Sequence, residues 1–286
     1  MDASGYVTAA GYLSCLEGRG ALVSAHRGGP EPGFPENALE TILATLDAVP
    51  ALIEVDVRET ADGVLVLMHD ETVDRTTNGS GTVATMSYEE LQALRLRDEN
   101  GKLTSLRIPR LIDVIEAVRG RSVLQLDVKR GVGLRQVAEA IEAADAAHFA
   151  AIITYGEGGA RAVAEASTRV SVSLDVDKAP RGREPRYVAG VLSRVGLPRE
   201  RVIGWTGITA APEEGIYAAL GREKIPASVG AIGTVDRRAA EGAQGLYLAF
   251  EEAGADILAT DRPREAAMEL GIEEVAAAAD ICRIDR

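Results

Sequence analysis

Two histidines and two carboxylates in the first quarter of the chain are the side chains best suited to chemistry. Each lies within or directly after an apolar run of strand length, and the four are His26, Glu54, Asp56 and His69. Parallel α/β folds place their chemistry at the carboxyl ends of buried strands, where such side chains converge. Imidazoles transfer protons near neutral pH, and paired carboxylates can bind a metal ion. We therefore expect a metal-assisted reaction in which His26 and His69 act as acid and base.

Glu54 and Asp56 are two residues apart in a predicted strand, so both side chains point to the same face. Two carboxylates buried side by side repel each other and cost on the order of several kcal/mol unless a cation compensates. This spacing favours a metal site. The alternative is a salt-bridged pair at the end of the strand, with Arg58 as the nearby cation.

A third carboxylate and a cation follow the same pattern on a later predicted strand. Asp127 and Lys129 are two residues apart and share a face. Asp127, Glu54 and Asp56 would then bring three carboxylates together at the same end of the sheet. Three acidic oxygens are a donor set typical of Mg²⁺ or Ca²⁺. The absence of clustered cysteines or histidines argues against zinc. Taken alone, Asp127 and Lys129 would indicate only an ion pair at a strand end.

The charge of the chain restricts its partners. The formal net charge is −13 at pH 7, from 44 acidic and 31 basic residues. Such a surface repels nucleic acid, and no basic stripe offsets it, so we expect no nucleic-acid partner. An anionic substrate would need local positive charge. Arg27, which is followed by two glycines, has a planar fork suited to phosphate, and Lys129 would add a second cation. The alternative for Arg27 is an ordinary surface side chain.

Apolar runs of strand length alternate with helical patterns along the chain. The runs are rich in Val, Ile and Leu, as expected of strands buried on both faces of a parallel sheet. This alternation predicts an α/β fold with right-handed crossovers, and the length suits one (β/α)8 TIM-barrel domain over residues 1–286. The predicted strands are 21–25, 52–57, 64–68, 122–128, 151–154, 170–176, 201–205, 228–232 and 256–259. The predicted helices are 38–48, 111–118, 134–146, 160–166, 187–195, 213–220, 238–253 and 263–285.

Nine predicted strands are one too many for such a barrel, and we expect the surplus strand within residues 170–205. An open doubly wound sheet is the alternative, although no Gly-x-Gly-x-x-Gly turn follows the first strand. The second and third strands are too close in sequence for a helical crossover. A polar insertion at about 70–110 follows the third strand, with one predicted helix over 87–94 that begins with a Ser87–Glu90 capping box. We expect this insertion to cover the site.

An ordered series of short motifs runs through the chain. The motifs are His26-Arg27-Gly28, Pro35-Glu36-Asn37, Glu54-Val55-Asp56-Val57, His69-Asp70 with Thr72, Asp74-Arg75-Thr76-Thr77, Gly79-x-Gly81, Ile108-Pro109-x-Leu111 and Gly254-Ala255-Asp256-Ile257-Leu258-Ala259-Thr260-Asp261-x-Pro263. In this order they resemble the glycerophosphodiester phosphodiesterase family of the phospholipase-C-like phosphodiesterase superfamily. The likeness is dense over residues 21–130, thin over 131–225, and present again at the end.

The resemblance implies a (β/α)8 barrel with a divalent-metal site. It also implies hydrolysis of a glycerophosphodiester, a small-molecule substrate, to an alcohol and glycerol 3-phosphate, the attacking group being water or the substrate's own glycerol hydroxyl. The implied site residues are the catalytic His26 and His69, the phosphate-binding Arg27 and Lys129, and the metal-binding Glu54, Asp56 and Asp127.

Three positions depart from the family pattern. The family usually has Glu where this chain has Asp127. The shorter side chain withdraws its oxygen by about 1.5 Å, so the strand, a water or a neighbour must make up the difference. Ala38 replaces the usual Thr after Asn37, which can still cap the next helix. The late-barrel aromatic of the family is absent from its usual place, and Trp205, the only tryptophan, would either contact the substrate or pack in the core.

Three alternative functions follow from the same residues. A lysophospholipase D or sphingomyelinase D-like phosphodiesterase is one, since the latter type resembles this chain in using Asp at the position of Asp127. A non-catalytic barrel that binds phosphate or metal is the second. A nucleotide-dependent α/β enzyme is the third, and it is disfavoured because no Gly-rich phosphate loop is present.

The sequence also bears on location and redox state. No apolar stretch approaches the roughly 18 residues of a membrane span, and the first residues lack the basic region of a secretory signal. We therefore expect a cytoplasmic protein without membrane insertion, and the sequence specifies no oligomeric state. Cys15 and Cys282 match no metal pattern and are expected to be independent thiols, with a disulfide between them as the alternative.

Overall fold

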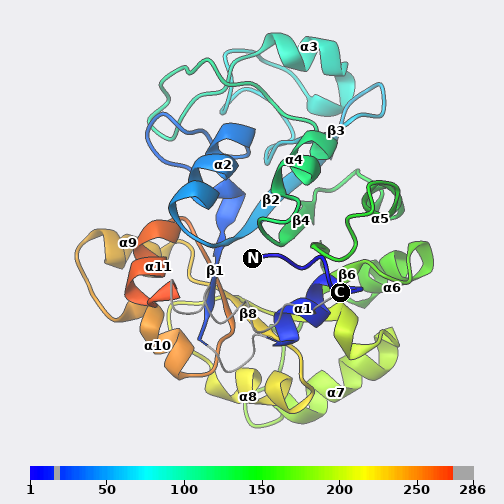
Figure 1. Cartoon of the computed structure of the whole chain (residues 1–286), viewed down its shortest axis with the longest axis vertical. Coiled ribbons are helices and arrows are strands. Elements are labelled where there is room, and N and C mark those ends of the chain that lie inside the picture. The colour runs from blue at the N-terminus through cyan, green and yellow to red at the C-terminus, as the bar shows by residue number, and fades with distance from the viewer. Residues whose placement is uncertain (16–19, 273–286) are drawn as a thin grey trace.

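The computed structural model is a closed barrel of parallel strands surrounded by helices (Figure 1), and it describes residues 1–15 and 20–272. The strands are β1 (Leu22–Ala25), β2 (Leu52–Glu59), β3 (Leu65–Leu67), β4 (Leu124–Val128), β5 (Ala150–Thr154), β6 (Ser171–Asp175), β7 (Val202–Ile208), β8 (Ala227–Gly230) and β9 (Ile257–Thr260). The helices are α1 (Ala9–Cys15), α2 (Leu39–Ala48), α3 (Tyr88–Ala93), α4 (Leu111–Val118), α5 (Leu134–Ala143), α6 (Glu157–Ala166), α7 (Glu184–Val195), α8 (Glu214–Arg222), α9 (Thr234–Ala240), α10 (Leu246–Glu252) and α11 (Pro263–Glu269).

The strand order confirms the predicted (β/α)8 barrel. Neighbouring strands run β1-β9-β8-β7-β6-β5-β4-β2, and a pairing between β1 and β2 closes the ring. All of these pairs are parallel. Closure excludes the open doubly wound alternative, in which the two edge strands would not pair.

The surplus strand is β3, so its expected location within residues 170–205 is wrong. β3 pairs antiparallel with β2, Val57 opposite Leu67 and Glu59 opposite Leu65. The few residues between β2 and β3 cannot form a helical crossover, so the chain can only turn back on itself. Both predicted strands within 170–205 belong to the barrel, as β6 and the start of β7.

The strands and helices meet in one large apolar core. Val55 and Val57 of β2 alternate with Glu54 and Asp56 and are fully buried, which gives β2 an apolar face beneath the helices and a carboxylate face inside the barrel. The helices show the matching pattern: α4 buries the residues at spacings of three and four, which are Leu111, Val114, Ile115 and Val118.

The helix predictions differ from the structure in three places. The predicted helix 238–253 is two helices, α9 and α10, because Gly242 and Gly245 between them adopt φ of 94° and 73°. Only the start of the predicted helix 263–285 is described, as α11, and residues 273–286 lie outside the described part. The sequence did not indicate α1.

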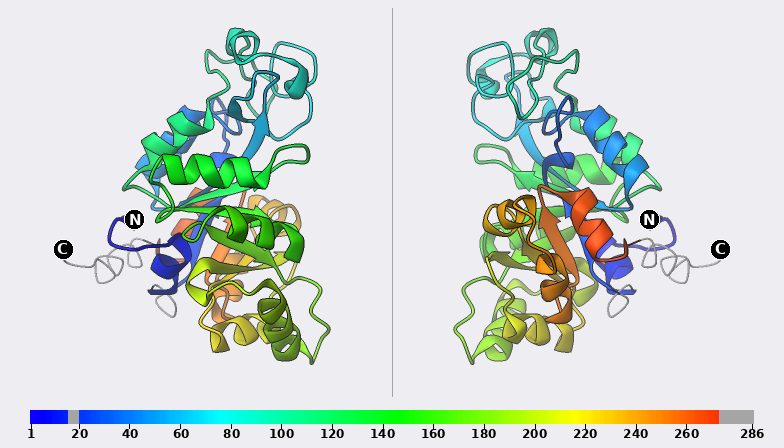
Figure 2. Two further views of the ribbon diagram at one scale, coloured as in Figure 1. Left: turned by 90° about the vertical axis from the view of Figure 1, so that its right-hand side faces the viewer. Right: turned by 90° about the vertical axis from the view of Figure 1, so that its left-hand side faces the viewer.

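Helix α1 covers the amino ends of the strands, away from the candidate site. The Ala10 amide in α1 donates to Ser171 Oγ at the start of β6, at 3.0 Å, and Thr8 bonds to the Glu200 carbonyl just before β7. Figure 2 shows the N-terminal segment and α1 together on one side of the barrel. This packing leaves the carboxyl ends of the strands as the open mouth.

The segment between β3 and α4 has a small core of its own. Its apolar residues pack on β3 rather than in the main core, and the cluster consists of Ala38, Val66, Met68, Val73, Val83, Leu91, Leu96 and Ile108. Helix α3 begins with the predicted capping box, in which the Ser87 side chain accepts from the Glu90 amide and the Glu90 side chain accepts from the Ser87 amide. Both views of Figure 2 show this segment (cyan) standing at one end of the molecule.

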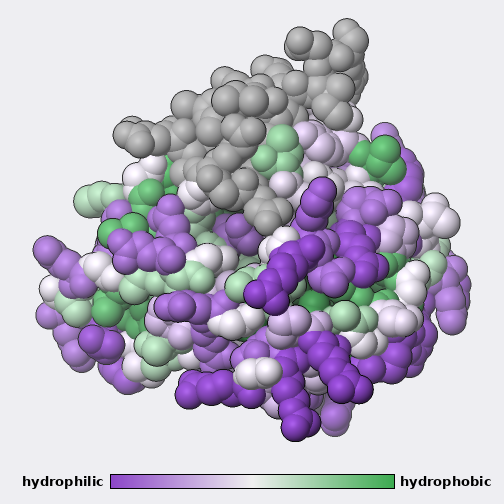
Figure 3. Space-filling view, turned by 90° about the horizontal axis from the view of Figure 1, so that it is seen from below, coloured by the Kyte–Doolittle hydropathy of each residue, from purple (hydrophilic) through white to green (hydrophobic). Residues whose placement is uncertain are grey.

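The surface and the termini add two observations. Hydrophilic side chains predominate over the face formed by α7 and α8, with only scattered apolar residues (Figure 3). None of the helices within residues 1–15 and 20–272 is long and apolar enough to cross a membrane. Cys15 takes part in a disulfide, so the expectation that it is an independent thiol is wrong; Cys282 lies outside the described residues.

Replacing Ser87 by Ala should loosen the segment around α3 without disturbing the barrel. The loss of an N-cap side chain costs about 1 kcal/mol. We expect faster amide hydrogen exchange in residues 88–94, measured by mass spectrometry, with unchanged exchange in the barrel strands. The matched control is Ser80→Ala, an exposed position in the same segment. Unchanged exchange in Ser87→Ala would show that the cap does not hold the helix.

Candidate active site

Three carboxylates from two adjacent strands meet at the mouth of the barrel. β2 and β4 pair with Asp56 directly opposite Asp127, and Glu54 lies two residues before Asp56 on the same face. All three side chains are buried, and one oxygen of each lies within 4.8 Å of the others. The guanidinium of Arg58 makes its hydrogen bonds to the His69 carbonyl, at 2.9 and 3.1 Å, and not to the trio. The predicted trio is therefore together and can hold a metal ion.

Lys129 supplies the internal positive charge of the trio. Its Nζ lies 2.6 Å from Asp56 Oδ1 and also contacts Asp127 Oδ2. Burial alone would lower the pKa of Lys129, but the charges of Asp56 and Asp127 raise it. Burial would likewise raise the pKa of Asp56, yet Lys129 holds it below its ordinary value. Lys129 is therefore cationic, and Asp56 is ionised.

Glu54 is the carboxylate that the protein does not neutralise. Its burial, followed by the charge of Asp56, raises its pKa from 4.5 to about 8. A backbone N–H of Arg27 donates to its Oε2 at 2.8 Å, which supplies a hydrogen bond but no full charge. With all three carboxylates ionised, the site would hold more buried negative charge than Lys129 and the Arg27 guanidinium offset. An all-oxygen donor set with this excess fits a hard divalent cation such as Mg²⁺ or Ca²⁺.

Arg27 lies in a strained turn beside the trio. It belongs to a 3₁₀ turn, His26–Gly28, that follows β1, and its φ of 52° is left-handed. This conformation directs its backbone N–H to Glu54. Its Nη1 lies 3.2 Å from Glu36, and its Nε lies 3.5 Å from Asp56 without a hydrogen bond. Arg27 therefore keeps a buried donor unused next to the carboxylates.

Asn37 does not cap helix α2, so that expectation is wrong. The N-cap of α2 is Ala38. Asn37 adopts a left-handed φ of 58°, and its side chain is instead bonded to Asp56. Its Nδ2 donates to Asp56 Oδ2 at 2.7 Å, and its Oδ1 accepts from the Asp56 amide at 2.9 Å. Asn37 thus holds both the side chain and the backbone of Asp56 in place.

His26 lies at the seam where the first and last strands of the barrel pair. β1 and β9 are in register with Ala25 opposite Thr260, which brings the next residues, His26 and Asp261, together. His26 Nδ1 lies 2.6 Å from Asp261 Oδ1. Burial would lower the pKa of His26, but the hydrogen bond to Asp261 and the charge of Glu54 raise it. Asp261 therefore fixes Nδ1 and leaves Nε2 for chemistry.

His69 reaches the same cluster through a chain of ion pairs. Its Nδ1 lies 2.7 Å from Asp70 Oδ1, so Asp70 orients the imidazole. Arg75 binds Asp70 and Glu36, and Glu36 also contacts Arg27. The hydrogen bonds from Arg75, followed by the one to His69, hold the pKa of Asp70 well below its ordinary range. The network links His69 to Arg27 and therefore to the trio.

A cavity of about 290 Å³ opens above these side chains. His26, Glu54 and Asp127 line it together with Trp205 and Tyr155. Trp205 thus faces the cavity and is not enclosed in the core. The Tyr155 hydroxyl, just after β5, donates to Asp127 Oδ1 at 3.0 Å.

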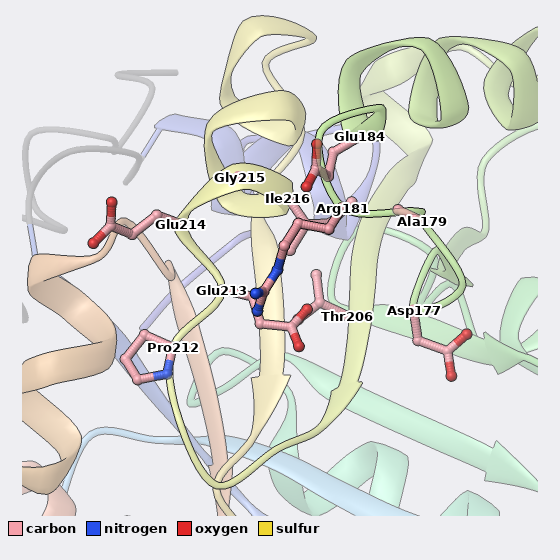
Figure 4. Close-up of a pocket in the computed structure, with 10 residues that line it drawn as sticks. All are labelled: Asp177, Ala179, Arg181, Glu184, Thr206, Pro212, Glu213, Glu214, Gly215 and Ile216. Atoms are coloured by element: carbon pink, nitrogen blue, oxygen red, sulfur yellow. The ribbon is translucent and has the colours of Figure 1, made fainter.

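A neighbouring cavity of about 440 Å³ lies between the loops that follow β6 and β7, and Asp177 lines both. Figure 4 shows the guanidinium of Arg181 beside Glu213 in this second cavity. None of the predicted site residues lines it. His26, Glu54 and Asp127 line the first cavity and not the second.

Sequence reasoning missed three partners of the predicted residues: Asn37, Tyr155 and Asp261. The last two directly follow strands, as the predicted site residues do, and this position was the available clue. Asp261 becomes a partner of His26 only because the last strand closes onto the first. The role of Asn37 depends on its left-handed backbone, which no spacing rule indicates.

The pKa of Glu54 predicts a pH-dependent stability in protein stripped of divalent ions. Because the folded state holds the Glu54 proton to about pH 8 and the unfolded state releases it near 4.5, the unfolding free energy should fall between these pH values, by up to about 1.4 kcal/mol per pH unit. Urea unfolding in chelator across this range measures the slope. Glu54→Gln should flatten it, and equal slopes in both proteins would contradict the assignment.

Replacing Asp261 by Asn should lower the pKa of His26. The variant removes the negative charge that favours the imidazolium while keeping a side chain of the same shape. NMR titration of the histidine ring protons reads the change directly. His148, which packs against Phe149 away from the site, is the internal control and should titrate as in the original protein. An unchanged His26 titration would remove Asp261 from its proposed role.

Comparisons with known proteins agree with this site. The model of the glycerophosphoryl diester phosphodiesterase family matches residues 26–216. A glycerophosphodiester phosphodiesterase of Caldanaerobacter subterraneus subsp. tengcongensis is 40% identical over 115 residues, which are 40% of this chain and 47% of that relative. The match thus spans less than half the length of this curated relative.

Solved structures extend the likeness over most of the chain. A glycerophosphoryl diester phosphodiesterase from Parabacteroides distasonis is 30% identical with a TM-score of 0.79, over 93% of this chain and 91% of that one. An Oleispira antarctica phosphodiesterase, solved with the product sn-glycerol-3-phosphate, shares the fold at 18% identity and a TM-score of 0.67, over 88% and 98% of the two chains. The family match covers about two thirds of the sequence, including every predicted site residue. The chain therefore belongs to the glycerophosphoryl diester phosphodiesterase family.

Proposed function

We propose that this chain hydrolyses glycerophosphodiesters to an alcohol and glycerol 3-phosphate, with one divalent cation, Mg²⁺ or Ca²⁺. The observation that carries the proposal is the buried trio of carboxylates, two of which, Glu54 and Asp127, line one cavity with His26. The family membership and the product bound to the Oleispira relative support the choice of substrate.

The carboxylates would hold the cation, and the surrounding bonds already arrange them for it. Glu54, Asp56 and Asp127 each present an oxygen to a common centre. When bound, a divalent cation supplies charge that offsets the developing negative charge on the phosphate oxygens. Asn37 and Lys129 keep Asp56 ionised and fixed before binding. Glu54, whose pKa is raised to about 8, would release its proton as the cation binds.

The two histidines would move the protons. Asp261 and Asp70 each occupy Nδ1 of one imidazole, so both rings offer Nε2 to the substrate. One histidine removes a proton from the attacking group, and the other protonates the departing alkoxide. The attacker is water, or the glycerol hydroxyl by way of a cyclic phosphate.

Positive charge and an apolar surface complete the site. The unused Nε donor of Arg27 lies beside the trio, where a phosphate oxygen would accept from it. Lys129 would add charge to the same oxygens. The ring of Trp205 would pack against the carbon side of the glycerol. The segment at about 70–110, which brings Arg75 to Glu36, would form the wall on the side of His69.

A lysophospholipid is the second candidate substrate, and one observation favours it. Tyr155 and Ile208 line the cavity but are 69% and 63% exposed. Large apolar side chains in such positions often mark a binding surface, and an acyl chain would cover them. The glycerophosphodiester is preferred because the cavity is small, about 290 Å³, and His26, Glu54 and Asp127 in its lining suit a polar headgroup.

The test is release of glycerol 3-phosphate from a panel of glycerophosphodiesters, and of lysophosphatidate from one lysophospholipid, with chelator and after Mg²⁺ or Ca²⁺ is restored. We expect activity only with metal. His26→Ala and His69→Ala should each lose about 10²- to 10⁴-fold in kcat. His148→Ala is the matched control and should keep full activity. Near-normal turnover in both single variants, or full activity in chelator, would refute the proposed mechanism.

A further inference from the structure

Tyr155 makes a contact that the proposed mechanism does not use. It is the first residue after β5, and β5 pairs with β4 so that Ile153 lies opposite Asp127. This register brings the Tyr155 hydroxyl over Asp127, to which it donates at 3.0 Å through Oδ1. Lys129 contacts the other oxygen, Oδ2. Both oxygens of Asp127 thus have a donor from the protein, one on each side.

The same arrangement recurs at the other two carboxylates. The backbone N–H of Arg27 donates to Glu54, and the side-chain Nδ2 of Asn37 donates to Asp56. Each member of the trio therefore has one uncharged donor that fixes its direction. Tyr155 fills this place for Asp127, the carboxylate that lies on β4 and not on β2.

Burial of the ring does not explain why Tyr155 lies there. The residue is 69% exposed, so little apolar surface is removed from water and the ring stabilises the fold only slightly. Its hydroxyl is the part of the side chain with a defined partner. The contact to Asp127 is therefore the feature to be explained.

We propose that Tyr155 is a positioning residue that sets the metal-binding carboxylate of Asp127. The inference rests on the proposed function. Asp127 is one methylene shorter than Glu54, and a hydrogen bond that fixes its rotamer keeps its oxygen in reach of the common centre. A carboxylate oxygen has two lone pairs, so Oδ1 can accept from the hydroxyl and still face a cation. Donors of this kind typically contribute about 10- to 100-fold to metal affinity.

The experiment is a direct titration with Mn²⁺, by calorimetry or electron paramagnetic resonance, of protein stripped of metal and without substrate. Tyr155→Phe removes only the hydroxyl, and its dissociation constant for Mn²⁺ should rise about 10-fold or more. Tyr88→Phe removes a hydroxyl in α3 that bonds Gln92 and should leave the constant within about twofold. Unchanged Mn²⁺ affinity in Tyr155→Phe, with normal binding by the original protein, would overturn the inference, even if the Michaelis constant changed.

A second background tests whether Tyr155 acts through Asp127. Asp127→Glu extends the carboxylate past the hydroxyl, so adding Tyr155→Phe there should change Mn²⁺ affinity by less than about twofold. An equal loss in both backgrounds would show that Tyr155 acts elsewhere. If the original protein itself fails to bind Mn²⁺, the metal site and the proposed function fail together with this inference. Urea unfolding in chelator, expected to be equal for the original protein and Tyr155→Phe, separates folding from binding.

Discussion

Three carboxylates buried within reach of one another are the constraint on which the rest of the site depends. Lys129, between the two aspartates, and the Arg27 guanidinium, beside Asp56, offset part of their repulsion. One uncharged donor also holds each carboxylate: the Arg27 backbone N–H at Glu54, the Asn37 side chain at Asp56 and the Tyr155 hydroxyl at Asp127. The barrel makes the arrangement possible, since parallel register places β2 and β4 side chains at one level. The compensation remains incomplete at Glu54, and that deficit is what makes the centre attractive to a cation.

Backbone strain is concentrated where these donors must point. Arg27 and Asn37 are two of the four non-glycine residues with left-handed φ in the described part of the chain. Each costs on the order of 1 kcal/mol or more. The backbone N–H of Asn37 also donates to the Arg27 carbonyl at 2.9 Å, so the two strained residues stabilise each other. The strain persists because it aims one donor at Glu54 and another at Asp56.

Features that depend on the alternation of side chains along a strand, or on the position of a strand end, could be predicted from the sequence. Features that depend on closure of the barrel, or on the backbone conformation of a loop, could not. Alternation within Leu52–Val57 was enough to place Glu54 and Asp56 on one face, and the barrel followed from the repeated βα pattern. The identity of β3 as the extra strand was misjudged, although its short link to β2 contained the reason. Asp261 could be assigned to His26 only once the last strand was known to pair with the first. Asn37 bonds Asp56 instead of capping α2, because its backbone is left-handed, which its neighbours in sequence do not indicate.

The pairing of β1 with β9 has a consequence for how the protein folds during its synthesis. His26 and its carboxylate partner are 235 positions apart, and nothing but the final turn of the ring unites them. In a nascent chain on the ribosome, or in a fragment cut before β9, the imidazole of His26 lacks its Asp261 partner. The sheet also has two unpaired edges. The candidate site is thus complete only after β9 has been synthesised and has paired with β1.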